Sequence, residues 1–143
     1  MILFSSELEL VTKKIIIMNK LIIDITNEKI FLMIITSNDI YNITEENTKI
    51  NYDKLTLIIN DFLNQNNMSI KDINKIYLNR GPGSFAGIRN IISMVKAIKL
   101  VNKIDYYCYS FRDFDGEKHI KYENIPDLCV KFKIEKNLIN PIY

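Results

Sequence analysis

One stretch decides how this chain folds, and it reads Arg80-Gly81-Pro82-Gly83-Ser84-Phe85-Ala86-Gly87-Ile88-Arg89. It holds three of the four glycines in the chain, and a glycine permits backbone shapes and close approaches that a Cβ atom prevents. Residues 75–78 before it are β-rich, and residues 88–100 after it carry apolar side chains at helical spacing. Such a glycine turn either presents N–H groups to an anion or lets helix and sheet pack closely. We favour close packing and keep the anion site as the alternative.

The anion interpretation would use Gly81, Gly83 and Ser84 at the start of the helix. The stretch does not match the two common nucleotide-binding motifs. A Walker loop requires Gly-Lys-Ser or Gly-Lys-Thr, and the chain contains neither triplet. The dinucleotide fingerprint tolerates Ala86 at its last position, but it expects an acidic residue that closes the next strand. Here Asp105 opens that strand instead.

Composition indicates one ordered domain, and its charge balance does not predict a nucleic-acid partner. The 143 residues fit a single domain, and the 48% hydrophobic content can fill a core. The net charge of +2 comes from interspersed acids and bases, so it predicts no nucleic-acid surface. Apolar runs are shorter than the ~20 residues that a membrane-spanning helix needs. We therefore expect a cytoplasmic protein.

The few cysteines and the single histidine limit which metal sites and catalytic groups the chain could form. Cys108 and Cys129 cannot form a disulfide framework or a metal-binding pattern by themselves, and they are expected to be free thiols. His119 is the only histidine and lies in a charged stretch. A zinc site built on several histidines is thereby excluded, and a histidine-based catalytic triad is not expected.

The remaining pattern predicts a mixed sheet with helices packed on it. Isoleucine-rich runs separated by short turns predict an antiparallel meander of three strands, at residues 20–25, 29–36 and 40–44. Two amphipathic helices are expected at residues 52–63, with Asn51 as N-cap, and at residues 88–100. Further elements are expected as a Ser-x-x-Asp cap at 69–72, strands at 75–78 and 105–111, and a weak strand within 127–134.

Three charged side chains are candidates for a functional role. Asp24 ends the first strand, where it could act in acid–base chemistry, although a strand-end aspartate more often caps its own turn. Arg80 and Arg89 bracket the glycine stretch and are two of only three arginines. Their guanidinium groups suit bidentate binding of a carboxylate or phosphate, and the alternative is an ordinary ion pair.

The glycine stretch resembles a known family signature. Residues 81–89, Gly-Pro-Gly-Ser-Phe-Ala-Gly-Ile-Arg, are similar to the G-P-G-S-F-T-G-L-R motif of bacterial TsaB (YeaZ) proteins. Further similarities are Lys96-Ala97 in the following helix, Ile22-Ile23-Asp24 in the first strand, and the final Pro141-Ile142-Tyr143. The resemblance covers residues 18 to about 111. It implies an actin-like (ASKHA, ribonuclease H-like) α/β lobe with about five strands and two main helices.

The residue pattern around Met18 and this resemblance together predict a domain division, and the resemblance implies a function. Residues 1–17 would be an N-terminal extension or a start-site artefact before Met18, residues 18–111 the actin-like lobe, and residues 112–143 the remnant of a second lobe and tail. The resemblance implies a non-catalytic, accessory subunit in threonylcarbamoyl modification of the tRNA adenosine beside the anticodon. Its expected partners are a TsaD-type transferase and a TsaE-type ATPase, with a homodimer as another state and tRNA contacted at most indirectly.

Neither cofactor nor metal is expected for the isolated chain, and ATP is expected only in a complex with partners. The expected motif and pairing residues lie in the glycine stretch and on the two helices: Arg80, Gly81, Pro82, Gly83, Ser84, Phe85, Gly87, Arg89, Ile91, Ile92 and Val95, with Leu55, Ile58, Ile59 and Phe62. An exposed apolar strip on these helices would mark the interface, and Ile91→Glu would test it if that side chain faced outward.

Three departures from the family pattern bear on this interpretation. Ile25-Thr26-Asn27 stands where many members carry T-S-T, and Asn51-Tyr52 stands where many carry H-S. The chain is also much shorter than usual members. These departures weigh against a nucleotide site more than against pairing, because the two helices are retained. The alternative function is a small phosphate- or nucleotide-binding module that uses Gly81–Ser84.

Overall fold

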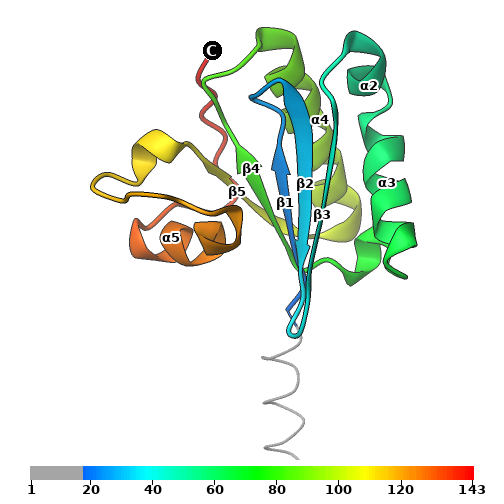
Figure 1. Cartoon of the computed structure of the whole chain (residues 1–143), viewed down its shortest axis with the longest axis horizontal. Helices are drawn as coiled ribbons and strands as arrows, with labels where there is room; N and C mark the ends of the chain where they lie inside the picture. The colour runs from blue at the N-terminus through cyan, green and yellow to red at the C-terminus, as the bar shows by residue number, and fades with distance from the viewer. Residues whose placement is uncertain (1–17) are drawn as a thin grey trace, which may run out of the picture.

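A computed structural model describes residues 18–143 (Figure 1). The extension or start-site artefact expected at residues 1–17 lies outside the described residues. Five strands form one sheet: β1 (Lys20–Asp24), β2 (Lys29–Ile35), β3 (Ile40–Glu46), β4 (Lys75–Asn79) and β5 (Asp105–Tyr109). Their order across the sheet is β3-β2-β1-β4-β5. The sheet is mixed, because β1–β2–β3 pair antiparallel while β4 and β5 run parallel to β1.

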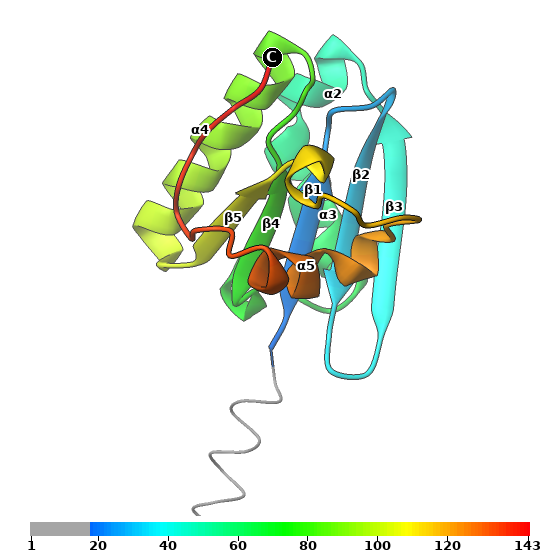
Figure 2. The same ribbon diagram turned by 90° about the vertical axis from the view of Figure 1, so that its left-hand side faces the viewer.

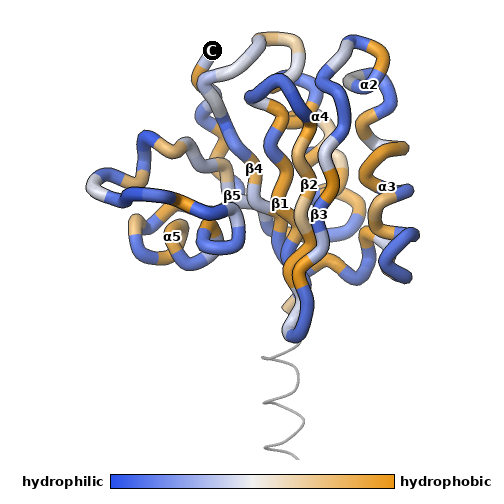
Figure 3. Tube along the Cα trace, in the orientation of Figure 1, coloured by the Kyte–Doolittle hydropathy of each residue, from blue (hydrophilic) through white to orange (hydrophobic). Residues whose placement is uncertain are grey.

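The antiparallel meander predicted from the first three strands is confirmed. Strand β1 pairs with β2 from Lys20↔Ile35 to Asp24↔Phe31, and β2 pairs with β3 from Lys29↔Glu46 to Ile35↔Ile40. Strand β1 is buried over most of its length, as its continuous apolar run predicts. Figure 3 shows hydrophobic residues concentrated in the central strands and helices and hydrophilic residues in the turns.

One face of the sheet is covered by helices α2 (Lys49–Asp53), α3 (Leu55–Gln65) and α4 (Phe85–Asn102). The apolar stripes of α3 and α4 face the sheet, where they join the larger hydrophobic core. Asn51 is not an N-cap, contrary to the prediction, because the helical segment already begins at Lys49. The Thr48 hydroxyl instead accepts from the Asn51 N–H at 3.2 Å, and the Asn51 amide donates to the Glu46 carbonyl at 2.6 Å.

Two other local predictions have different outcomes. The Ser-x-x-Asp cap is confirmed, since Ser69 and Asp72 form a reciprocal capping box around the 3₁₀ turn η1 (Ile70–Asp72). The weak strand expected within 127–134 is wrong, because this region contains helix α5 (Ile125–Lys131). Pro126 lies in the first turn of α5, where its missing N–H costs no helical hydrogen bond.

The second face of the sheet is covered by the C-terminal part of the chain. It consists of the 3₁₀ turns η2 (Phe111–Asp113) and η3 (Tyr122–Asn124) and helix α5, which lies opposite α3 and α4 (Figures 1 and 2). The second core contains these side chains from the sheet and from the segment that covers it: Ile22, Met33, Tyr77, Tyr109, Phe114, Ile125, Leu128 and Cys129. Residues 112–134 therefore pack directly on the sheet, while their origin as remnant of a second lobe stays a prediction.

No helix within residues 18–143 is both long enough and apolar enough to cross a membrane.

Helix α5 offers a matched test of whether the second face belongs to the same cooperative unit. Ile125 is 0% exposed and Val130 is 77% exposed, both on α5. Ile125→Ala should lower the free energy of unfolding by about 2–4 kcal/mol, because it leaves a cavity in the second core. Val130→Ala should change it by less than about 0.5 kcal/mol. Urea unfolding measures both, and equal effects would show that α5 unfolds separately from the sheet.

Candidate functional site

The glycine stretch forms the connection between β4 and α4. The Asn79 side chain at the end of β4 accepts a hydrogen bond from the Gly81 N–H at 3.0 Å. Ser84 is the N-cap of α4, and its hydroxyl accepts from the Gly87 N–H at 3.2 Å. The helix thus begins at Phe85, three residues earlier than the apolar stripe from Ile88 indicates. Polar side chains therefore fix both ends of the loop.

Close packing excludes a Cβ at Gly81 and leaves little room for one at Gly83. Gly81 has a φ of 119°, and a Cβ on it would lie 2.0 Å from the carbonyl oxygen of Ile142. The same tail residue donates its N–H to the Arg80 carbonyl at 2.8 Å. A Cβ on Gly83 would lie 3.1 Å from Ile88 Cδ1 and 3.2 Å from Thr26 Cα. This geometry supports the close-packing interpretation, and anion binding by Gly81, Gly83 and Ser84 stays a prediction.

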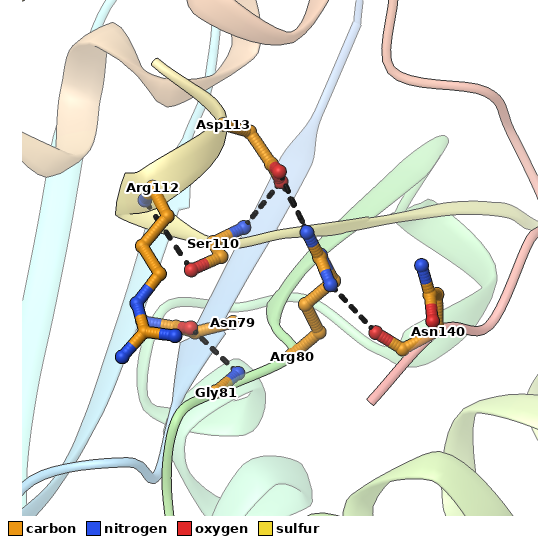
Figure 4. Close-up of polar contacts among 7 residues, drawn as sticks. All are labelled: Asn79, Arg80, Gly81, Ser110, Arg112, Asp113 and Asn140. Carbon is orange, nitrogen blue, oxygen red and sulfur yellow. Dashed lines mark hydrogen bonds and ion pairs between the residues drawn. The ribbon is translucent and has the colours of Figure 1, made fainter. Parts of the chain in front are cut away.

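Arg80 lies at the centre of a second set of contacts (Figure 4). Its Nε and Nη2 donate to the two carboxylate oxygens of Asp113 at 3.2 and 2.6 Å, and its Nη1 donates to the Asn140 carbonyl at 2.8 Å. The Ser110 N–H also donates to Asp113, at 2.8 Å. The bidentate geometry expected of this arginine is present, but the carboxylate belongs to the chain itself. Arg80 thereby ties β4 to the turn after β5 and to the C-terminal tail.

An exposed cluster lies at the first turn of α4. The Arg89 guanidinium lies 5.0 Å from the Phe85 ring centroid, and the Phe85 and Tyr143 rings are 4.7 Å apart. Phe85, Arg89 and Tyr143 are all exposed, and so is Pro82 in the loop. A shallow hollow of about 280 Å³ beside this cluster is lined by Phe85, Ala86, Arg89, Asn90 and Ser93. Aromatic and arginine side chains in such exposed positions suit protein contacts.

Asp24 is buried and fully engaged. Its Oδ1 accepts from the Thr26 N–H at 2.9 Å and from the Thr26 hydroxyl at 2.6 Å. Its Oδ2 accepts from the Asn79 amide at 3.0 Å and from the Tyr122 hydroxyl at 2.7 Å. The turn-capping interpretation of Asp24 is therefore confirmed. Tyr122 was missed because no local signal connects it with a strand end 98 residues away.

The helix residues named from sequence divide into two groups. Leu55, Ile59, Phe62, Ile91 and Val95 are buried in the core against the sheet, and Gly87 is buried as well. Ile58 and Ile92 are half-buried. Because Ile91 is 0% exposed, its replacement by glutamate would place a charge in the core and would not test pairing.

The outward surface of α3 and α4 carries other apolar residues. Leu57 is 56% exposed on α3, and Leu100 and Val101 are exposed near the end of α4, whereas the half-buried Met94 and Ile98 pack against the larger core. A groove of about 260 Å³ between the helices is lined by Asp53, Leu55, Thr56, Asn90 and Met94. The sequence stripe could not identify this surface, because helical periodicity selects the residues that face the core.

The remaining reactive groups are dispersed. Burial raises the pKa of the Cys108 thiol to about 12 and that of the Cys129 thiol to about 12, so both are protonated near neutral pH. His119 is exposed. Within residues 18–143, no group of three His, Cys, Asp or Glu side chains is arranged to hold a metal ion.

Gly81 and Gly116 form a matched pair for testing the tail contact. Both have a positive φ, but a Cβ on Gly116 would meet nothing within 4 Å. Gly116→Ala should cost about 1 kcal/mol of unfolding free energy from backbone strain alone. Gly81→Ala should cost at least about 2 kcal/mol more, because it also displaces Ile142. Hydrogen exchange of the Ile142 N–H should accelerate only in Gly81→Ala, and an unchanged exchange rate would contradict the tail contact.

The hydrogen bond between Tyr122 and Asp24 predicts an alkaline effect. Burial, followed by the nearby Asp24 charge, raises the pKa of Tyr122 above its ordinary value of 10. The unfolded chain then loses this proton at lower pH than the folded chain, so stability falls as pH rises above about 10. Tyr122→Phe should remove part of this loss. Urea unfolding at pH 8 and 11 measures the difference, and an equal loss in both proteins would contradict the pKa shift.

Three comparisons place this geometry among known proteins. The TsaD family, described as tRNA N6-adenosine threonylcarbamoyltransferase, matches residues 45–110. YeaZ from Pseudomonas aeruginosa matches with a TM-score of 0.60 and 19% identity, covering 65% of this chain and 44% of its own. A structure described as an uncharacterized protein with similarity to peptidase YEAZ from Pseudomonas aeruginosa gives the same score, identity and coverage of this chain, and 43% of its own. Curated protein sequences gave no match.

The chain spans less than half the length of the two YeaZ-type structures. The family match over residues 45–110 includes α3, β4, the glycine stretch and α4. These comparisons confirm the resemblance inferred from the glycine motif and the expected actin-like α/β fold. The chain is therefore similar to TsaD-family and YeaZ proteins over part of its length, and it has the actin-like α/β fold of the YeaZ structures.

Proposed function

We propose that this chain acts in threonylcarbamoyl modification of tRNA as the non-catalytic partner of a TsaD-type transferase. The match to the TsaD family over residues 45–110 and the YeaZ-like fold support the pathway. We infer the partner role from the exposed apolar residues of α3 and α4 and from the internal contacts of the glycine loop.

The observation that carries the proposal is that α3 and α4 each expose large apolar side chains beside the groove between them. Leu57, Leu100 and Val101 expose apolar side chains there, and the groove lined by Thr56, Asn90 and Met94 runs between the helices. Exposed apolar surface of this kind is stabilised when a partner covers it. The pairing surface in this proposal is thus the outer side of the two helices that the sequence selected, with different side chains from those first named.

The glycine loop supports a structural role for its own residues. The Arg80 guanidinium and the Asp24 carboxylate are both bonded to groups of the chain. The Gly81 N–H is bonded to Asn79, and the Ile142 carbonyl occupies the space beside Gly81. These internal contacts support a structural role for the loop, and phosphate binding at Gly81–Ser84 stays the alternative prediction.

The complete assembly in this proposal contains a TsaE-type ATPase in addition to the transferase. ATP would act in the assembled complex, tRNA would contact this chain at most indirectly, and the complex would work in the cytoplasm. The catalytic chemistry would belong to the TsaD-type subunit.

Co-purification with the TsaD-type protein of the same organism tests the proposal. The tagged chain should form a stoichiometric heterodimer, sized by light scattering. Leu57→Glu should weaken it by more than about 30-fold, because pairing would bury an uncompensated charge. Val130→Glu is the matched control, since Val130 is 77% exposed on the opposite side of the sheet. Absence of a complex, or equal effects of both variants, would contradict the proposed pairing surface.

A further inference from the structure

Helix α4 carries charges of one sign. Its 18 residues include Arg89, Lys96 and Lys99 but no aspartate or glutamate. Lys99 is neutralised within the chain, because its Nζ lies 2.6 Å from Asp105 Oδ1. Arg89 and Lys96 are exposed, and no carboxylate within residues 18–143 forms an ion pair with either of them. Among the described residues, these two cations of α4 are therefore uncompensated.

Arg89 and Lys96 lie on one outward face of α4. They are seven residues apart, which is about two helical turns or ~10 Å along the helix axis. The buried residues Ile91 and Val95 occupy the opposite side of the helix, against the sheet. Exposed residues follow one another along the outward face at intervals of four, three and four positions, namely Arg89, Ser93, Lys96 and Leu100. This is the spacing by which one helix packs along another.

Apolar side chains border the two cations at both ends of this face. Phe85 lies one turn before Arg89 and is 56% exposed, and the Arg89 guanidinium lies 5.0 Å from its ring centroid. Leu100 lies one turn after Lys96 and is 83% exposed. We call this stripe, which consists of Phe85, Arg89, Ser93, Lys96 and Leu100, the basic face of α4. It combines large apolar contacts with two defined positive positions.

The basic face fits a protein partner better than a nucleic acid. A nucleic-acid surface neutralises many phosphates with clustered lysines and arginines, whereas this face offers two cations between exposed apolar residues. The neighbouring helix α3 contains Asp61 and no basic residue, so it does not extend the positive surface. The basic face is not self-complementary either, because a second α4 would oppose these cations with its own. Its charges are therefore matched by acidic side chains of a different protein.

We propose that the TsaD-type subunit covers the basic face with a helix that carries two acidic side chains about seven residues apart. One carboxylate lies opposite Arg89 and the other opposite Lys96. Apolar side chains of the same partner helix lie opposite Phe85 and Leu100. This inference rests on the proposed function, and it specifies the chemistry of the partner's surface.

The two ion pairs determine which helix α4 accepts and how that helix is aligned. Pairing buries both cations, and a buried charge without a partner is costly. A partner helix that lacks acidic residues, or that is shifted by one turn, leaves the cations of α4 unpaired. Charge thus adds selectivity to an interface whose affinity comes from its apolar residues.

Charge reversal in the full chain tests the basic face. The Kd of the heterodimer with the TsaD-type protein should rise with salt in the wild type, because salt screens ion pairs. Arg89→Glu combined with Lys96→Glu should raise this Kd by at least about tenfold. The matched control is Lys118→Glu combined with Lys121→Glu, which changes the net charge equally on the segment that covers the opposite face of the sheet. The control should change the Kd by less than about twofold.

Neutral substitutions separate the effect of charge from the effect of packing. Arg89→Gln combined with Lys96→Gln removes both charges and keeps polar side chains, so this variant should lose most of the salt dependence. All the substituted side chains are exposed, and each variant should therefore keep the circular dichroism spectrum of the wild type.

A salt-independent Kd in the wild type, or equal effects of the two charge reversals, would overturn the inference. So would a reversal at Arg89 and Lys96 that abolishes tRNA binding by the assembled complex while the heterodimer persists. Leu57→Glu separates this inference from the proposed function. A heterodimer that Leu57→Glu weakens and the α4 reversal does not weaken would overturn only the acidic partner helix, whereas absence of any heterodimer would contradict both.

Discussion

The contact between the C-terminal tail and the glycine loop constrains most of this structure. The Ile142 carbonyl occupies the place of the missing Gly81 Cβ, and the Ile142 N–H bonds to the Arg80 carbonyl. From the same residue, the Arg80 side chain reaches Asp113 and the Asn140 carbonyl. The glycine loop, the turn that contains Asp113 and the C-terminal tail are distant in sequence. They therefore meet at Arg80 and Gly81. This meeting of chain segments explains why position 81 requires a glycine.

The buried carboxylate of Asp24 extends the same connection to the other side of the sheet. It receives hydrogen bonds from its own turn, from Asn79 at the end of β4, and from Tyr122 in the segment that covers the second core. A buried charge is stable only with such partners. The second face of the sheet is thus closed by a short segment that is held both by apolar packing and by this carboxylate.

Local sequence signals predicted the parts of the fold that depend on local order. Isoleucine-rich strands, the helix stripes and the Ser69–Asp72 cap all follow from periodicity or from neighbouring residues. Helix α5 was predicted as a strand, because its short apolar run has no clear period and only Pro126 marks its start. The Arg80–Asp113 and Asp24–Tyr122 contacts could not be predicted, since each joins residues that only the folded chain brings together. The outward residue Leu57 was missed because the periodic stripe marks the opposite side of its helix.

The charged groups near the carboxyl ends of β1 and β4 also bear on what the site can do. Arg80 or Asp24 could bind a phosphate or a metal ion only after leaving its internal partners. Hydrogen bonds to charged groups contribute about 1.5–3 kcal/mol each, and Asp24 accepts four while Arg80 donates three. A ligand would have to offset several of these bonds before it gained any affinity. The outer surfaces of α3 and α4 have no such competition, so recognition by this fold is more readily built on these helices than on the glycine loop.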